Sequence, residues 1–187
     1  MKKMILILLA GVLGTSISTA QKKEGDLINW VTFEEALALQ KQKPKKIMMD
    51  VYTVWCGPCK MLDKNTFKNK DVADYVNENY YAVKFNAQGD GDIDYNGRTF
   101  SNPGYDPAKA MRRNATHELA RALKVRAFPT IVFFDEEGNF IAPIQSYKTP
   151  QQLELYLKLF KDDEHKNMKT QDDFNTYYSA FVPSFKG

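Results

Sequence analysis

"VWCGPCK", from Val54 to Lys60, holds the only two cysteines of this 187-residue chain, with two residues between them. Such a pair serves as a structural bridge, as half of a metal site, or as a dithiol that exchanges electrons with other proteins. A disulfide across two residues closes so small a loop that it gains little entropy. A zinc site takes four ligands, and the chain adds only His117 and His165, which are not in a ligand-like spacing. Redox chemistry is therefore the favoured interpretation.

The N-terminus has the order of a secretory signal. Lys2 and Lys3 precede an apolar run over residues 4–13, and small residues continue to Ala20. The run is shorter than the roughly 20 residues that span a bilayer. We therefore expect residues 1–20 to be a signal peptide and the protein to be periplasmic or otherwise exported, and soluble after cleavage near Ala20. A retained N-terminal anchor is the alternative.

Charge and length limit the class of protein. Removing the signal removes two lysines and no acid, so the net charge falls from +3 to +1. A near-neutral chain with scattered charges does not predict nucleic-acid binding. The remaining length suits one domain with its own core, which we expect to act as a monomer. Two cysteines cannot form the disulfide scaffold of a small secreted domain, so the pair points to chemistry.

Helix and strand patterns alternate along the first half of the mature chain. Thr32 and Glu35 have the capping-box spacing at the start of a helix. The apolar runs at residues 46–54 and 81–87 are short and suit buried strands. Residues 60–80 between them predict one or two helices, broken near Asn65 to Lys70.

The second half predicts a helix, a hairpin and another helix. Helical spacing begins at Asn114, which we interpret as a helix start rather than a glycosylation site. Residues 128–144 predict two strands joined by a turn at 137–139. Thr149 and Pro150 predict the cap and first position of the next helix. The order predicts an α/β fold: a mixed central sheet with helices on both faces, parallel early strands and an antiparallel closing hairpin.

Residues 88–114 form an insertion after the second central strand. Residues 92–97 match the first half of an EF-hand calcium loop, but Pro103 stands where the loop needs its glutamate. Asn96-Gly97 between two short strand-like runs is a strong hairpin signal. We therefore favour a surface hairpin, at which substrate selectivity could be built.

The ordered features resemble the thioredoxin superfamily between about Trp30 and Phe160. They are an aspartate in the strand before the motif, the motif itself, a lysine in the next strand, and a Phe-Pro-Thr sequence that opens the hairpin. These residues are Asp50, "WCGPCK", Lys84, and Phe128, Pro129 and Thr130. The resemblance implies a thioredoxin fold over residues 21–160, with residues 161–187 as an extension that adds a C-terminal helix.

The helix after the motif departs from thioredoxin. Thioredoxins carry a proline five residues after the second cysteine, where this chain has Lys64. The segment is instead similar to the periplasmic C-terminal domain of the membrane thiol-disulfide interchange reductases. Those domains place an acid four residues after the second cysteine, here Asp63, and then a Thr-Phe pair, here Thr66-Phe67.

The residues around the cysteines suggest roles. At the start of a helix, backbone N–H groups and the helix dipole favour a thiolate. We expect Cys56 to be the exposed nucleophile and Cys59 to resolve the mixed disulfide. A buried Asp50 has a raised pKa and could take the proton of Cys59, with Lys84 as its partner. Asp63 is a weaker second candidate. The alternatives are ordinary exposed positions for both acids and a lysine whose stem alone is buried.

The resemblance also implies a substrate-contact surface. In that family a cis-proline loop faces the cysteines, so Pro129 is predicted to be cis. Phe128 then offers its backbone to a substrate strand, Pro129 and Thr130 are substrate-binding residues of the same loop, and Trp55 supplies an apolar surface. An ordinary core tryptophan is the alternative.

The predicted activity is an exported thiol-disulfide oxidoreductase that acts as a reductant. Gly57 and Pro58 are the residues between the cysteines of thioredoxin, which is about 150 mV more reducing than DsbA. We predict exported proteins with disulfides as substrates and a membrane electron donor for re-reduction. No metal or other cofactor is expected beyond the redox-active disulfide. The alternatives are an oxidase or isomerase, or a non-catalytic module of the same fold that binds a metal such as copper.

Overall fold

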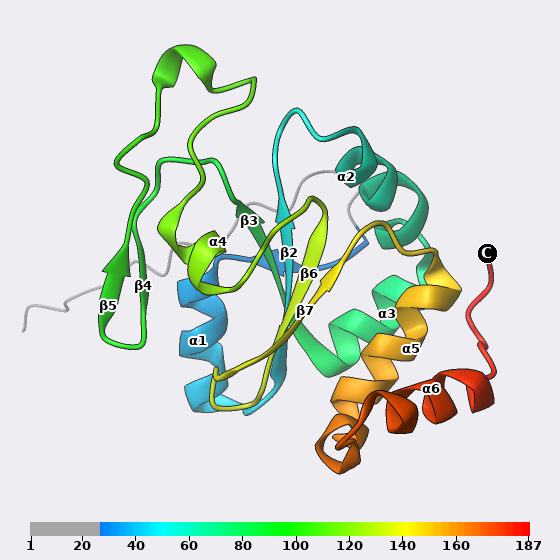
Figure 1. The fold of residues 1–187 in the computed structure, drawn as a ribbon. Coiled ribbons are helices and arrows are strands. Elements are labelled where there is room, and N and C mark those ends of the chain that lie inside the picture. The colour runs from blue at the N-terminus through cyan, green and yellow to red at the C-terminus, as the bar shows by residue number, and fades with distance from the viewer. Residues whose placement is uncertain (1–26) are drawn as a thin grey trace, which may run out of the picture.

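A five-stranded sheet forms the centre of the fold, with the spatial order β1-β3-β2-β6-β7 (Figure 1). The computed structural model describes residues 27–187, so the predicted signal peptide lies outside the described residues. β1 and β2 are parallel to β3, whereas β6 is antiparallel to β2 and to β7. The predicted mixed sheet is confirmed. Its strands are β1 (Trp30–Val31), β2 (Lys46–Tyr52), β3 (Tyr80–Asn86), β6 (Thr130–Phe134) and β7 (Phe140–Gln145).

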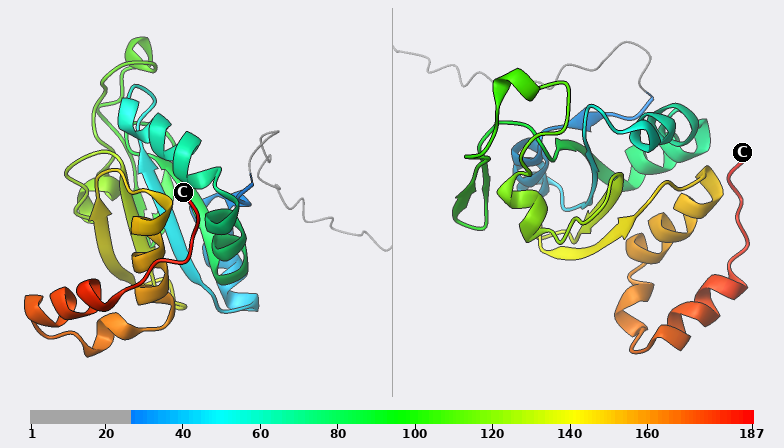
Figure 2. Two further views of the ribbon diagram at one scale, coloured as in Figure 1. Left: turned by 90° about the vertical axis from the view of Figure 1, so that its right-hand side faces the viewer. Right: turned by 45° about the horizontal axis from the view of Figure 1, so that its top comes forward.

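Helices cover both faces of the sheet (Figures 1 and 2). One core cluster joins the sheet to the helices that follow the cysteine motif and to the long helix near the C-terminus. A second cluster joins the opposite face to two other helices. The first group is α2 (Gly57–Leu62), a π-helical turn (Asp63–Phe67), α3 (Lys70–Asn79) and α5 (Pro150–Lys161); the second is α1 (Phe33–Gln42) and α4 (Glu118–Ala122).

Alternation along β2 assigns its side chains to the two faces. Met48 packs in the cluster beneath α2, α3 and α5, whereas Met49 and Val51 pack in the cluster beneath α1 and α4. Successive side chains of a strand point to opposite faces, so Asp50 points to the same face as Met48. The parallel register of β2 and β3 pairs Asp50 with Lys84. Both polar side chains therefore lie on the face that α2 covers.

The helix boundaries follow the predicted signals. Thr32 and Glu35 form the capping box of α1, and Thr149 caps α5 with Pro150 in its first turn. The predicted break after the motif is also present. The π-helical turn ends at Phe67, and a separate helix, α3, follows with its own cap. Side-chain caps satisfy backbone N–H groups that have no partner inside a helix.

The insertion contains the predicted hairpin. β4 (Ile93–Tyr95) pairs with β5 (Arg98–Phe100), and Asn96 and Gly97 form the turn with φ values of 51° and 73°. Tyr95 and its neighbour Phe100 anchor this hairpin in the core cluster of the α1 face. A short 3₁₀ turn (Pro107–Lys109) follows at the end of the sheet where β2 leads into α2 (Figure 1).

The helix predicted from Asn114 begins later, at Glu118. Asn114 instead binds the backbone of Asp106, because its Oδ1 accepts the Asp106 N–H and its Nδ2 donates to the Asp106 carbonyl. His117 caps the helix by accepting the N–H of Leu119 at Nδ1. The prediction was wrong because side chain–backbone bonds in a loop compete with helix formation.

The added C-terminal helix is confirmed. α6 (Gln171–Ala180) follows α5 through a 3₁₀ turn (Glu164–Asn167), and the last residues return along α5 and α3 (Figure 2). Glu154 of α5 holds this return by accepting the backbone N–H groups of Ser184 and Phe185. Within residues 27–187, no helix has the length and apolar character needed to cross a membrane.

Candidate active site

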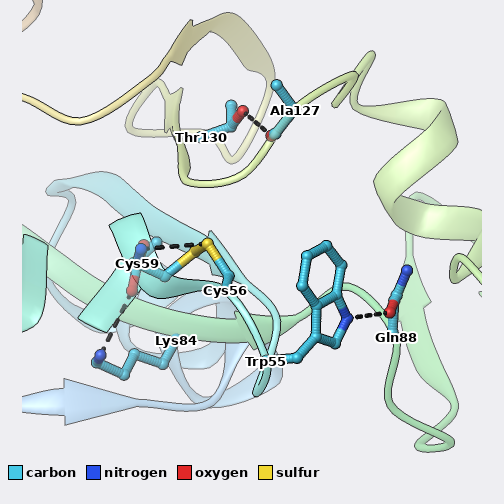
Figure 3. Close-up of a disulfide and its surroundings, with 8 residues drawn as sticks. Trp55, Cys56, Cys59, Lys84, Gln88, Ala127 and Thr130 are labelled. Atoms are coloured by element: carbon cyan, nitrogen blue, oxygen red, sulfur yellow. Dashed lines mark hydrogen bonds and ion pairs between the residues drawn. A yellow bond between two sulfur atoms is a disulfide. The ribbon is translucent and has the colours of Figure 1, made fainter. Parts of the chain in front are cut away.

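The two cysteines form a disulfide at the start of α2 (Figure 3). β2 ends at Tyr52, and a turn closed by the Cys56 N–H and the Thr53 carbonyl leads into the helix. Cys56 caps α2, and the N–H of Cys59 donates to its sulfur over 3.1 Å. An N–H that donates to the Cys56 sulfur at the start of a helix favours negative charge on that sulfur. The local geometry therefore matches the expected position of a nucleophilic thiolate.

The exposure expected for Cys56 is not observed. Cys56 and Cys59 are each only 3% exposed. Surface access comes instead from a hollow of about 540 Å³ that Cys56 lines together with the exposed residues Gly57 and Pro58. Cys59 does not line the hollow. Cys56 therefore faces the opening and Cys59 does not, although the exposed fractions of the two residues are equal.

A buried polar cluster lies on the face that α2 covers. Asp50 is 2% exposed, and its Oδ2 lies 3.4 Å from the Lys84 Nζ. The same ammonium group contacts Asp63 Oδ1. The structure thus brings together all three charged residues that the sequence indicated. The Asp50 Oδ1 atom is buried and has no hydrogen-bond partner among the described residues.

Burial dominates the titration of this cluster. It raises the pKa of Asp50 from 3.8 to about 7, although the charge of Lys84 acts in the opposite direction. Burial lowers the pKa of Lys84, but Asp50 and Asp63 more than offset this effect, so the net shift is upward. Asp50 is therefore divided between its protonated and ionised forms near neutral pH, beside a lysine that stays charged. A group balanced in this way can accept or donate a proton.

Aromatic rings hold Lys84 in place. Its Nζ lies 4.8 Å from the ring centre of Trp30, 5.4 Å from that of Tyr52 and 5.7 Å from that of Phe67. Ring faces attract a cation. Phe67 belongs to the Thr-Phe pair that follows Asp63. The segment after the motif, whose sequence differs from that of thioredoxin, therefore supplies one of the rings that surround Lys84.

The outer side of the disulfide has an aromatic rim. The Trp55 ring meets the Phe128 ring edge-on, with centres 6.3 Å apart. Trp55 Nε1 donates to Gln88 Oε1 over 2.8 Å (Figure 3). The same oxygen accepts the Asn114 N–H. Trp55 is half-buried and lines the hollow. The insertion is tied to the active-site motif through Gln88.

The loop before β6 forms the opposite wall. The Phe128–Pro129 peptide bond is cis. Thr130 is fully buried and donates to the Ala127 carbonyl over 2.7 Å (Figure 3). Thr130 therefore shapes the loop rather than facing the hollow. Ala127 and Phe128 do line it.

Two functional candidates at this site escaped the sequence analysis. Arg113 and Arg126 line the hollow with Cys56, and both are exposed. The proximity of Arg126 to the predicted cis-proline loop is a signal that could have indicated it. Arg113 lies in the insertion and carries no comparable signal in the sequence. Among residues 27–187, no group of three or more His, Cys, Asp or Glu side chains could hold a metal ion.

Comparison with known proteins identifies the family. A family model described as a thioredoxin-like domain matches residues 33–161. This chain belongs to the thioredoxin-like family. Solved structures agree with the fold of this thioredoxin-like domain. A thioredoxin-fold protein from Helicobacter pylori is 18% identical, with a TM-score of 0.54 over 81% of this chain and 84% of that one. A structure described as DsbH oxidoreductase is also 18% identical, with a TM-score of 0.52 over 83% and 95% of the two chains.

Curated relatives of this thioredoxin-like domain are named thiol:disulfide interchange protein DsbD. The protein from Vibrio vulnificus is 30% identical over 66% of this chain and 17% of its own length. The protein from Cronobacter sakazakii is 31% identical over 56% of this chain and 14% of its own. The chain thus spans less than a fifth of these relatives. The predicted similarity to thiol-disulfide interchange proteins is confirmed.

Proposed function

We propose that this protein is an exported thiol-disulfide oxidoreductase that reduces disulfides in other exported proteins. The observation that carries the proposal is the hollow that reaches Cys56 but not Cys59, at the start of a helix and above a buried carboxyl group. Membership of the thioredoxin-like family and similarity to proteins named for thiol-disulfide interchange support it.

The reaction consists of two exchanges. The Cys56 thiolate attacks one sulfur of a substrate disulfide, so a Cys56–substrate bond forms and the other substrate sulfur leaves with the electron pair. Cys59 then attacks the Cys56 sulfur, forms the intramolecular disulfide and releases the second substrate thiolate. The substrate gains two electrons and two protons, and the protein loses them.

Asp50 is the proposed proton acceptor for Cys59. Cys59 is buried, and a buried thiol must lose its proton before it attacks. Asp50 lies on the sheet face beneath α2, and its pKa of about 7 matches proton transfer near neutral pH. Lys84 limits the rise of that pKa, and Asp63 in turn holds Lys84. We assign Lys84 and Asp63 positioning roles.

Phe128 is the proposed docking point for the substrate backbone. Within the described residues, neither its N–H nor its C=O takes part in a hydrogen bond. An extended peptide beside the loop could satisfy both groups, as strand addition does in other peptide-binding proteins. Trp55 and the Phe128 ring then cover the apolar part of the bound segment.

The direction of the redox reaction, the export of the protein and the re-reduction of its disulfide are parts of the same proposal. The Gly57-Pro58 pair favours a reductant, since thioredoxin has a potential of about −270 mV against about −120 mV for DsbA. The signal-like N-terminus supports export. A reductant outside the cytoplasm needs a continual supply of electrons, so we propose a membrane-bound dithiol donor as the partner that re-reduces Cys56 and Cys59.

Insulin reduction tests the activity. The reduced protein should cleave the interchain disulfides of insulin, and Cys56→Ser should abolish turnover. Asn65 is exposed and lies in the π-helical turn that follows α2. Asn65→Ser is therefore the control, and it should leave turnover unchanged. Absence of turnover by the wild type would contradict the proposal.

The reduction potential tests the direction. Equilibration with glutathione buffers should give a midpoint for the Cys56–Cys59 couple nearer to about −270 mV than to about −120 mV. A midpoint close to the value of DsbA would reverse the assignment to an oxidant.

A further inference from the structure

Two guanidinium groups border the opening that leads to Cys56. Arg113 and Arg126 line the hollow, and its lining contains no aspartate or glutamate. Both arginines are exposed. Within the part of the chain that the structure describes, neither forms an ion pair with a carboxylate. The approach to the reactive sulfur is therefore positively charged, and its charges are not neutralised by the protein.

The side chain of Arg113 packs on Trp55 of the cysteine motif. Its guanidinium lies 4.7 Å from the ring centre of Trp55. The next residue, Asn114, is fixed by bonds to both the N–H and carbonyl of Asp106, and its own N–H donates to Gln88. Gln88 also accepts the Trp55 Nε1–H, so one side chain connects the insertion to the active-site motif (Figure 3).

Arg126 reaches the hollow from a different segment. It precedes the loop with the cis peptide bond at Pro129, and its neighbours Ala127 and Phe128 also line the hollow. The two cations thus come from the insertion and from the cis-proline loop. A substrate that enters the hollow to reach Cys56 therefore lies beside both cations.

The chemistry of these groups selects a class of substrate. A guanidinium binds a carboxylate through two parallel hydrogen bonds, and charges near an interface raise the association rate of partners of opposite sign. We propose that Arg113 and Arg126 make the protein selective for disulfides flanked by aspartate or glutamate. This inference rests on the proposed function and adds the substrate class to it.

The substrate we infer is a polypeptide segment rather than a free anion. The aromatic rings of Trp55 and Phe128 lie beside the cations, and the unbonded backbone of Phe128 suits an extended chain. A peptide that carries carboxylates next to its disulfide satisfies all three features together.

Single-turnover kinetics with synthetic peptides test the inference. Three peptides of equal length carry one intramolecular disulfide flanked by Asp, Ser or Lys residues. Pre-reduced protein is mixed with each peptide, and the second-order rate constant is followed by quenched-flow mass analysis. No external electron donor is needed, so the comparison isolates the encounter with Cys56.

The wild type should reduce the Asp-flanked peptide on the order of tenfold faster than the Lys-flanked peptide at low ionic strength. The ratio should fall towards one at about 0.5 M salt, where exposed charges are screened. Arg113→Gln combined with Arg126→Gln should reduce the ratio to less than about twofold. Arg112→Gln combined with Arg121→Gln is the matched control, since both are exposed and outside the hollow's lining, and it should keep most of the preference.

The ratio of the rate constants for the Asp-flanked and Lys-flanked peptides distinguishes substrate selectivity from a change in the reactivity of Cys56. Loss of two cations could also make the Cys56 thiol less acidic, but that would slow all three peptides together. Equal rates for the Asp-flanked and Lys-flanked peptides with the wild type, or an unchanged ratio in the hollow variant, would overturn the inference alone. No reduction of any peptide would overturn the proposed function and this inference with it.

Discussion

Asp50 and Glu154 are both buried carboxyl groups with a lysine within reach, yet their surroundings differ. Glu154 is fully buried and accepts hydrogen bonds from Lys158 and from the backbone N–H groups of Ser184 and Phe185. Asp50 has Lys84 3.4 Å from one oxygen, and its other oxygen has no partner among residues 27–187.

The pKa values of the two groups move in opposite directions. Burial raises the pKa of Glu154, but the bonds from Lys158, Ser184 and Phe185 more than offset it, and the net shift is downward. Burial of Asp50 is only partly offset by Lys84, and its pKa rises to about 7. Several donors fix a buried carboxylate in its charged form, whereas missing donors leave it free to exchange a proton. The first arrangement anchors the C-terminal residues, and the second suits catalysis.

The largest expected effect is on stability at alkaline pH. The folded state holds a proton on Asp50 more tightly than the unfolded chain does, so the free energy of unfolding falls as the pH rises from about 4 to 7. Asp50→Asn removes this loss. Urea unfolding of the oxidised protein at pH 8 should show a gain of up to about 4 kcal/mol for the variant, which disappears near pH 4.

A matched control for that experiment is Asp74→Asn. Asp74 is exposed and pairs only with Lys70 of its own helix, so its replacement should change stability by less than about 1 kcal/mol. If Asp50→Asn were less stable than the wild type at pH 8, burial would not be the dominant influence on Asp50.

The same substitution should slow the second exchange. Without a proton acceptor, Asp50→Asn should resolve the mixed disulfide on the order of 100-fold more slowly at pH 7. The wild-type rate should show an inflection near pH 7 that the variant lacks. Stopped-flow fluorescence of Trp55 measures the resolution rate, with Asp74→Asn as the control. An unchanged pH profile in Asp50→Asn would remove this residue from the mechanism.

Glu154→Gln should have the smaller and opposite effect on stability. The N–H groups of Ser184 and Phe185 both donate to Oε2, which the amide oxygen can replace, but an NH₂ group at the Oε1 position can no longer accept the bond from Lys158. Breaking a bond to a charged group should cost about 2 kcal/mol in the free energy of unfolding. The cost should fall as the pH drops below the pKa of the wild-type carboxyl group, because Glu154 is then protonated as well.

Hydrogen exchange locates that effect. Residues 181–187 should lose protection in Glu154→Gln, and insulin reduction should stay within about twofold of the wild type. The exposed residue Glu137 offers the control Glu137→Gln. Slower insulin reduction, with residues 181–187 still protected, would show that Glu154 takes part in the chemistry.

Local signals explain how much of the fold was predictable. Thr32 and Thr149 are caps whose partners lie three residues away, and Asn96-Gly97 defines its hairpin by the turn itself. Each depends on neighbours in sequence. Asn114 shows the limit, because its competing partner Asp106 lies eight residues earlier across an irregular loop.

The candidate site was predictable where a motif or a strand register indicated it. Cys56, Cys59 and the pairing of Asp50 with Lys84 follow from the motif and from adjacent parallel strands. The hollow at Cys56 is lined by the motif together with residues of the insertion and of the loop before β6, which are distant in sequence. The position of Arg113 depends on how the insertion packs, which no short-range pattern encodes, whereas the sequence places Arg126 close to the predicted cis-proline loop.

Trapping of the mixed disulfide tests the central claim most directly. Reduced Cys59→Ser should accumulate a covalent complex with a disulfide-containing substrate such as insulin, joined through Cys56 and detected by mass spectrometry of the alkylated digest. Cys56→Ser should accumulate no such complex, since Cys59 does not line the hollow. A complex formed through Cys59, or none with either variant, would contradict the account.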